Sequence, residues 1–141
     1  MKFLMDHIVL NVEDVEKMTL FYSRVLLMPP ERLEEYRAGR VPFPSVRMNA
    51  ETVVDLFPKD MWRAEAPDGK GFGNLNHFCI ALNQGMWQDL IKRLESNNVP
   101  VEEGPVPRWG ARGTGTSIYF RDPEYNLIEA RYYEDKNNSE G

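Results

Sequence analysis

The chain has 141 residues, with 42% apolar residues, 28% charged residues and a formal net charge of −5. These values are typical of one globular domain and exclude a disordered or low-complexity chain. Both halves are acidic, with 12 acidic and 10 basic residues in 1–70 and 10 and 7 in 71–141, so a nucleic-acid or anionic-membrane partner has no electrostatic support.

The first half predicts a strand, a helix and three further strands. Residues 3–12 alternate between an apolar face with Ile8 and Leu10 and a more polar face with His7, which is typical of a strand with two unlike faces. Residues 13–27 have apolar side chains at helical spacing, and the helix is expected to end before the following proline pair. The three later strands are predicted over 31–40, 41–48 and 52–57.

The second half predicts the same order after a break. Residues 58–75 are rich in proline and glycine and are the best candidate for a linker. A strand is expected over 76–82 and a helix over 84–98. Three strands follow over 99–104, 116–122 and 126–133, with a turn at 122–126 between the last two. The polar tail 135–141 is expected to be frayed.

The order of elements is therefore repeated. DHIVLNV aligns with NHFCIAL at an offset of 70 residues, and TVVDLF aligns with NLIEAR at an offset of 74. The prediction is one α+β domain over 1–134, made of two βαβββ modules at 1–57 and 76–134. Helices on the apolar faces would leave an open, cup-shaped mixed β-sheet with the helices outside.

Each module carries one histidine on its first strand and one carboxylate on its last strand. The pairs are His7 with Asp55 and His77 with Glu129, separated by 48 and 52 residues, and the chain has only these two histidines. All four lie on the faces opposite the apolar ones, so they are expected to point into the cup. Imidazole and carboxylate groups suit Zn, Ni, Co, Mn or Fe, and the pattern predicts one divalent metal per site. Asp55 is the least secure ligand, because it is one methylene shorter than Glu129.

The remaining composition points to an ordinary intracellular protein. A single cysteine excludes an internal disulfide, the N-terminus does not suit a signal peptide, and no apolar run reaches the length of a membrane span. The expected address is cytoplasmic, with no membrane partner.

These motifs resemble the vicinal oxygen chelate superfamily, which includes glyoxalase I, fosfomycin-resistance transferases, ring-cleaving dioxygenases and bleomycin-binding proteins. The resemblance covers about residues 3–134 and rests on DHIVLNVEDVEKMTLFYSRVL and VPVEEGPVPRWGARGTGTSIYFRDPEYNLIEARYY. It is strongest to the small glyoxalase-domain proteins. By position, His7, His77 and Glu129 match family metal ligands, whereas Asp55 stands where glyoxalase I has glutamate.

The resemblance implies a metal-dependent lyase or isomerase that binds adjacent oxygens of a small substrate and stabilises an enediolate-type intermediate. Glu129 is the better candidate for the proton-transferring base, and Asp55 is the second. Two alternatives stay open, an Fe(II)-dependent ring-cleaving dioxygenase and a non-catalytic small-molecule-binding protein of the bleomycin-resistance type. The resemblance also implies a homodimer, with the cup formed within one chain or shared across the dimer.

Three further residues are candidates for substrate binding. Arg131 falls on the same strand face as Glu129, where its guanidinium could bind a substrate carboxylate. Arg108 and Trp109 lie in the glycine-rich stretch RWGARGTG, which is expected to be a loop that could close over the cup.

Overall fold

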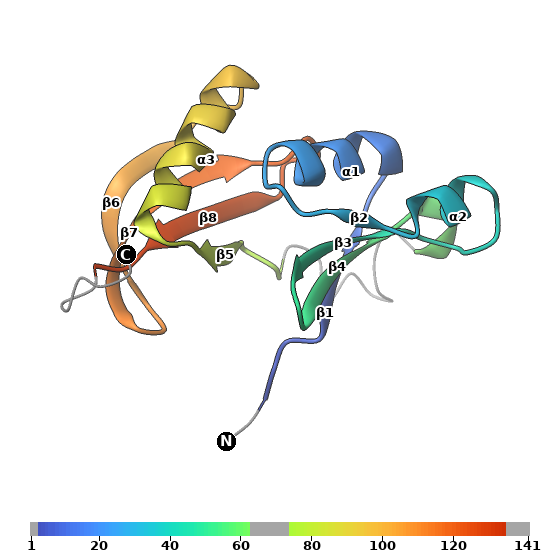
Figure 1. The fold of residues 1–141 in the computed structure, drawn as a ribbon, viewed down its shortest axis with the longest axis horizontal. Coiled ribbons are helices and arrows are strands. Elements are labelled where there is room, and N and C mark those ends of the chain that lie inside the picture. The colour runs from blue at the N-terminus through green and yellow to red at the C-terminus, as the bar shows by residue number, and fades with distance from the viewer. Residues whose placement is uncertain (1–2, 63–73, 135–141) are drawn as a thin grey trace. The chain divides into compact units, whose positions relative to one another are not determined.

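The computed structural model describes residues 3–62 and 74–134, and it divides the chain into two compact units, Met1–Asn74 and Leu75–Gly141. Most of the predicted linker and the whole predicted tail lie outside the described residues. Each unit contains one four-stranded mixed sheet with a helix packed on it, as Figure 1 shows. The α+β class and the two related modules are confirmed. Within the described segments, no helix is long and apolar enough to cross a membrane.

Unit one has its strands in the order β1-β4-β3-β2, with β1 and β4 parallel and the other pairs antiparallel. The strands are β1 His7–Asn11, β2 Pro30–Glu31, β3 Ser45–Asn49 and β4 Thr52–Phe57. Helix α1 spans Val15–Arg24, and Asp14 caps it by accepting a hydrogen bond from the Lys17 amide at 2.9 Å. Its buried face includes Met18 and Tyr22, both 0% exposed. This burial fixes which face of the sheet is covered.

Unit two repeats this order as β5-β8-β7-β6, again with one parallel pair, β5 with β8. Its elements are β5 Phe78–Ala81, α3 Gln84–Ser96, β6 Glu103–Gly110, β7 Gly113–Arg121 and β8 Leu127–Tyr132. Trp87 holds α3 on the sheet, because its indole N–H donates to the Ala130 carbonyl at 2.9 Å and its ring packs against Tyr132. The predicted turn at 122–126 is confirmed, with the Asp122 carboxylate accepting from two backbone amides inside it.

Three sequence predictions differ from the structure. The strand expected over 99–104 begins only at Glu103 and continues to Gly110 as β6. The strand expected over 31–40 is only the short β2, and the chain then forms helix α2, Leu33–Arg37. Leu, Glu and Arg favour helix, and the Glu34–Arg37 ion pair, 2.7 Å long, supports the turn. The glycine-rich stretch expected to be a loop is instead the tip of the β6–β7 hairpin, in which Gly110 pairs with Gly113.

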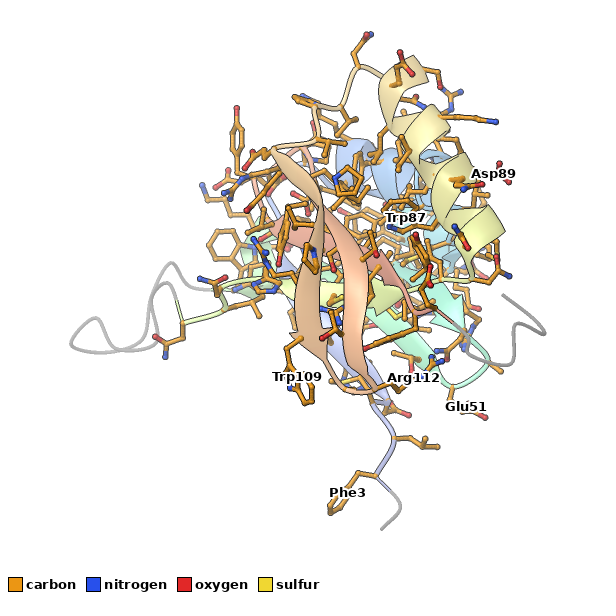
Figure 2. The ribbon with its side chains drawn as sticks, turned by 90° about the vertical axis from the view of Figure 1, so that its left-hand side faces the viewer. Phe3, Glu51, Trp87, Asp89, Trp109 and Arg112 are labelled. Carbon is orange, nitrogen blue, oxygen red and sulfur yellow. The ribbon has the colours of Figure 1, made fainter. Side chains whose placement is uncertain are left out.

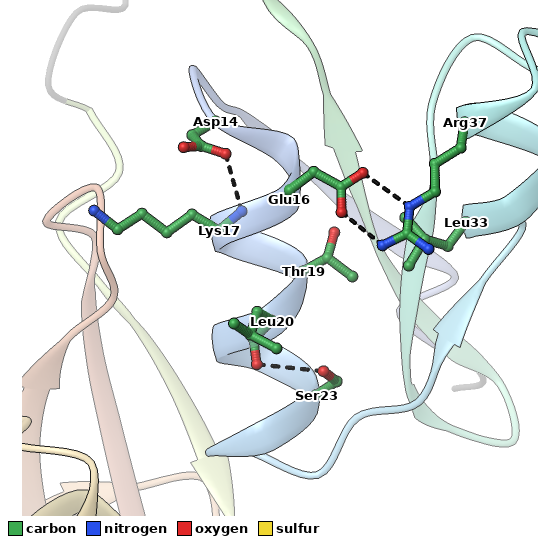
Figure 3. A pocket seen from close by; sticks show the side chains of 8 residues that line it. All are labelled: Asp14, Glu16, Lys17, Thr19, Leu20, Ser23, Leu33 and Arg37. Carbon is green, nitrogen blue, oxygen red and sulfur yellow. Dashed lines mark hydrogen bonds and ion pairs between the residues drawn. The ribbon is translucent and has the colours of Figure 1, made fainter.

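An exposed ion pair joins α1 and α2. Arg37 donates to both carboxylate oxygens of Glu16, at 2.9 and 2.6 Å, at one side of an open groove of about 620 Å³ (Figure 3). This hydrogen bonding lowers the pKa of Glu16 below its ordinary value of 4.5, because the charged guanidinium favours the carboxylate.

Loss of this pair is expected to lower stability slightly and in a pH-dependent way. A lowered pKa in the folded state stabilises the fold above pH 4.5, and this contribution disappears as the pH falls through the folded value. Arg37→Gln should therefore have a slightly lower Tm than the wild type at pH 7, and this difference should shrink as the pH falls below 4.5. Arg40→Gln removes an exposed charge nearby and serves as the control. A difference in Tm from the wild type that does not change with pH, or that is equally large for Arg40→Gln, would contradict the role of the ion pair.

Candidate metal centre

In unit one, the parallel pairing of β1 with β4 places Asp55 opposite Val9, two residues after His7. The Asp55 side chain is 8% exposed and accepts a hydrogen bond from the Ser45 hydroxyl on β3 at 2.6 Å. The His7 ring is about half exposed, and its Nδ1 lies 2.7 Å from the Asp6 carboxylate. The hydrogen bond to Asp6, followed by the charge of Asp55, raises the pKa of His7. His7 and Asp55 thus share one electrostatic environment.

In unit two, the equivalent pair is in direct contact. Glu129 on β8 lies opposite Cys79, two residues after His77, and its Oε1 is 3.0 Å from His77 Nε2. Nδ1 of His77 lies 2.6 Å from the Asn76 side-chain oxygen, and the ring packs edge-on against Tyr119. The sequence-predicted pairing of a histidine with a carboxylate is therefore observed within this unit.

Both histidines are oriented in the same way. The residue immediately before each one, Asp6 or Asn76, supplies an oxygen acceptor for Nδ1. When a metal takes the place of the proton on Nε2, a hydrogen bond from Nδ1–H to such an acceptor holds the ring in position, which is the usual support for a histidine that ligates a metal. This support was not predicted from the sequence, although the aligned dipeptides Asp6-His7 and Asn76-His77 place an oxygen acceptor before each histidine.

Glu129 is deeply buried, at 3% exposure, yet its surroundings favour the charged carboxylate. Burial alone would raise the pKa of Glu129, but hydrogen bonds from Ser117, Arg131 and His77 and the charge of Arg131 outweigh it and lower the pKa.

A serine hydroxyl donates to the carboxylate in each unit, Ser45 to Asp55 in one and Ser117 to Glu129 in the other. Neither serine could be predicted from local sequence pattern, because the register of the neighbouring strand decides which hydroxyl reaches the carboxylate.

The three candidates for substrate binding occupy different places. The Arg131 guanidinium is 3% exposed and donates to Glu129 Oε2 at 2.7 Å. The Arg108 side chain pairs with Glu103 at 2.6 Å and lies over the Tyr119 ring. Trp109 is 80% exposed near the tip of the β6–β7 hairpin (Figure 2). Of these three, only Arg131 contacts a predicted metal ligand.

The donors in each unit fit part of a divalent-metal site. Within residues 3–62 and 74–134, no three His, Cys, Asp or Glu side chains gather as a metal-binding group, and each unit contributes one histidine and one carboxylate. When two ligand atoms each lie about 2.1 Å from an ion and subtend a right angle at it, the two atoms are about 3 Å apart. The separation of 3.0 Å between His77 Nε2 and Glu129 Oε1 matches that value. Imidazole nitrogen with carboxylate oxygen is also a donor set that Zn, Fe, Ni, Co and Mn accept.

Comparison with known proteins gives consistent matches over most of the chain. The family model of the Glyoxalase/Bleomycin resistance protein/Dioxygenase superfamily matches residues 4–130. Glyoxalase domain-containing protein RDO1 of Mycosarcoma maydis is 33% identical over 134 residues, which cover 93% of this chain and 69% of the relative. Virulence protein STM3117 of Salmonella typhimurium is 31% identical over 129 residues, which cover 91% of this chain and 83% of the relative. The protein VPC_CASS1 from the mobile metagenome of V. Pseudocholerae has a similar solved structure, with a TM-score of 0.74 and 29% identity over 96% of this chain and 98% of that one.

Proposed function

The chain belongs to the glyoxalase/bleomycin resistance protein/dioxygenase superfamily, and we propose that it is a divalent-metal-dependent lyase or isomerase of the glyoxalase type. Members of this superfamily bind small molecules, typically with the help of a divalent metal. The observation that carries the proposal is the repeated unit of a histidine, its Nδ1 acceptor, a buried carboxylate and a serine. A protein that only sequesters a small molecule has no need for this set.

We propose His7, His77 and Glu129 as metal ligands and Asp55 as a fourth. When bound, a divalent ion supplies Lewis acidity that stabilises negative charge developing on adjacent oxygens of a small substrate. The chain supports this in three ways. Asp6 and Asn76 orient the imidazoles, Ser45 and Ser117 orient the carboxylates, and the hydrogen bonds to Glu129 keep it ionised despite its burial.

Proton transfer is assigned to a carboxylate. We propose Glu129 as the first candidate for the base and Asp55 as the second. Both are buried carboxylates in the same units as the histidines, and a carboxylate can accept a proton from a substrate carbon and return it to a neighbouring position. Arg108 and Trp109 on the hairpin are proposed to contact the substrate outside the ligand set. We also propose a homodimer, which the mass measured by light scattering in solution tests directly.

The proposal is tested by metal content and then by turnover. Elemental analysis of native protein, and of protein loaded with Ni, Zn, Mn or anaerobic Fe(II), is expected to give one metal ion per chain. Failure to bind any of these ions would overturn the enzyme assignment and favour a metal-free binding protein. Turnover of the hemithioacetal of methylglyoxal and glutathione would support the lyase, whereas oxygen consumption with catechols would replace it by the ring-cleaving dioxygenase.

A further inference from the structure

The two carboxylate oxygens of Glu129 have different surroundings. Oε2 accepts hydrogen bonds from the Ser117 hydroxyl at 2.6 Å and from Arg131 Nη2 at 2.7 Å. Oε1 instead faces His77 Nε2 at 3.0 Å. With Oε2 engaged by two donors, Oε1 is the oxygen available to an ion or a proton on the histidine side.

The Arg131 guanidinium is enclosed by the β6–β7 hairpin. Its Nη1 donates to the Arg108 carbonyl at 3.2 Å and its Nη2 to the Trp109 carbonyl at 3.1 Å. Its Nη1 also lies 3.3 Å from the Tyr133 hydroxyl. One guanidinium therefore joins the carboxylate of Glu129 to the backbone at the hairpin tip.

The glycines of RWGARGTG make this enclosure possible. A Cβ added at Gly110 would lie 2.0 Å from Arg131 Nη1, and a Cβ added at Gly115 would lie 3.3 Å from Arg131 Cδ. Any side chain at 110 would therefore displace the guanidinium or the hairpin. Close packing around Arg131 therefore explains Gly110 and Gly115, whereas Gly113 has a φ of +103° at the turn and an added Cβ there would meet no atom within 4 Å.

Unit one lacks this arrangement. In the strand pairing, Phe57 lies opposite Asn11 two residues after Asp55, just as Arg131 lies opposite Ala81 two residues after Glu129. Phe57 packs on Phe43, with ring centroids 4.7 Å apart, and supplies no hydrogen bond to Asp55. Unit two therefore has an arginine at the position where unit one has a phenylalanine.

We propose that Arg131 is a positioning residue, which holds Glu129 by Oε2 so that Oε1 is presented beside His77 and which couples this carboxylate to the position of the β6–β7 hairpin tip. This deepens the proposed function and rests on it for the part that concerns the metal. A direct role of Arg131 in binding substrate would require it to release Glu129 and two backbone carbonyls, since its two terminal nitrogens already donate to them.

The test combines metal affinity with a signal from the hairpin. Co²⁺ affinity and the visible spectrum of the Co²⁺ protein report on Glu129, and the indole ¹H–¹⁵N resonance of Trp109 in metal-free protein, assigned with Trp109→Phe, reports on the tip. Arg131→Gln is expected to weaken Co²⁺ binding 10–100-fold, the usual effect of losing a group that supports a ligand, and to shift the Trp109 resonance. Arg131→Lys should recover part of the Co²⁺ affinity but not the wild-type position of the Trp109 resonance. Lysine keeps the positive charge but lacks the planar guanidinium that donates to several acceptors at once.

Two matched controls separate positioning from general destabilisation. Arg121→Gln removes an arginine of the same unit that also binds a carboxylate and a carbonyl, those of Glu102 and Tyr125, and should leave both signals unchanged. Gly110→Ala should weaken Co²⁺ binding although residue 110 is not a ligand, whereas Gly85→Ala, whose added Cβ has its nearest neighbour at 3.7 Å, should not. Gly110→Ala also keeps the proposal testable if Arg131→Gln does not fold.

The outcomes distinguish this proposal from the proposed function. Wild-type Co²⁺ affinity in both Arg131→Gln and Gly110→Ala would overturn the positioning role. A wild-type protein that binds no Co²⁺ would overturn the metal-dependent function instead. In that case a shifted Trp109 resonance in Arg131→Gln, absent in Arg121→Gln, would still support the coupling between the arginine and the hairpin, and an unshifted one would refute it.

Discussion

His77→Ala is expected to reduce the affinity for a divalent metal by more than 100-fold while leaving the fold intact. The ring is partly exposed at the end of its strand, so little packing is lost, but Nε2 is the nitrogen placed 3.0 Å from Glu129 Oε1. Removing a direct ligand costs more than removing a supporting hydrogen bond, which typically costs 10–100-fold. Competition with a chromogenic chelator, using Co²⁺, Ni²⁺ or Zn²⁺, measures the effect.

The matched variant is Asn76→Ala, which leaves His77 in place but removes the acceptor 2.6 Å from its Nδ1. We expect the metal affinity of Asn76→Ala to lie between those of the wild type and His77→Ala, since the imidazole would be free to rotate or change tautomer. His7→Ala and Asp6→Ala form the corresponding pair in unit one. An affinity for His77→Ala equal to that of the wild type would remove His77 from the ligand set.

Trp87→Ala is expected to destabilise the protein by about 3–5 kcal/mol, the usual cost of removing a buried aromatic side chain. Trp87 is 5% exposed and fills the contact of α3 with β8. Trp87→Phe keeps most of the packing but leaves the buried Ala130 carbonyl without its indole donor, which costs about 1–3 kcal/mol. Urea unfolding followed by circular dichroism gives these free energies.

Trp109→Ala is the control for these measurements, because Trp109 is 80% exposed. Its free energy of unfolding should stay within about 0.5 kcal/mol of the wild type. Ala130 lies between Glu129 and Arg131, so Trp87 also fixes the part of β8 that carries both charged groups. An equal loss of stability for Trp87→Ala and Trp109→Ala would contradict the packing described for α3.

The sequence predicted those features that depend on local pattern. Alternation identified β1, β4, β5 and β8, and helical spacing identified α1 and α3, because one face of each element is buried against a neighbour. The repeat located one histidine and one carboxylate in each unit. It also placed Glu129 and Arg131 on one strand face, since residues two apart in a strand point the same way.

The parts that the sequence did not predict depend on contacts between distant residues. Alternation cannot tell whether Arg131 faces a substrate or its neighbour Glu129, and only the fold of the β6–β7 hairpin shows the carbonyls that hold it. Likewise, Ser117 was overlooked because its role depends on the register of β7 against β8. The glycines near 110 predicted a loop because local rules do not anticipate a guanidinium packed against them.

The single hydrogen bond that holds Asp55, compared with the ion pair that holds Glu129, has a consequence for how the protein can diversify. Lengthening the carboxylate at 55 by one methylene, or changing Phe57 beside it, breaks no buried ion pair. Replacing either Glu129 or Arg131 leaves the other buried charge without its partner, which lowers the stability of the fold. In a library of random variants selected for folded protein, substitutions should therefore accumulate at 55 and 57 and remain rare at 129 and 131. Unit one is the half of the molecule in which a new substrate preference can evolve most easily.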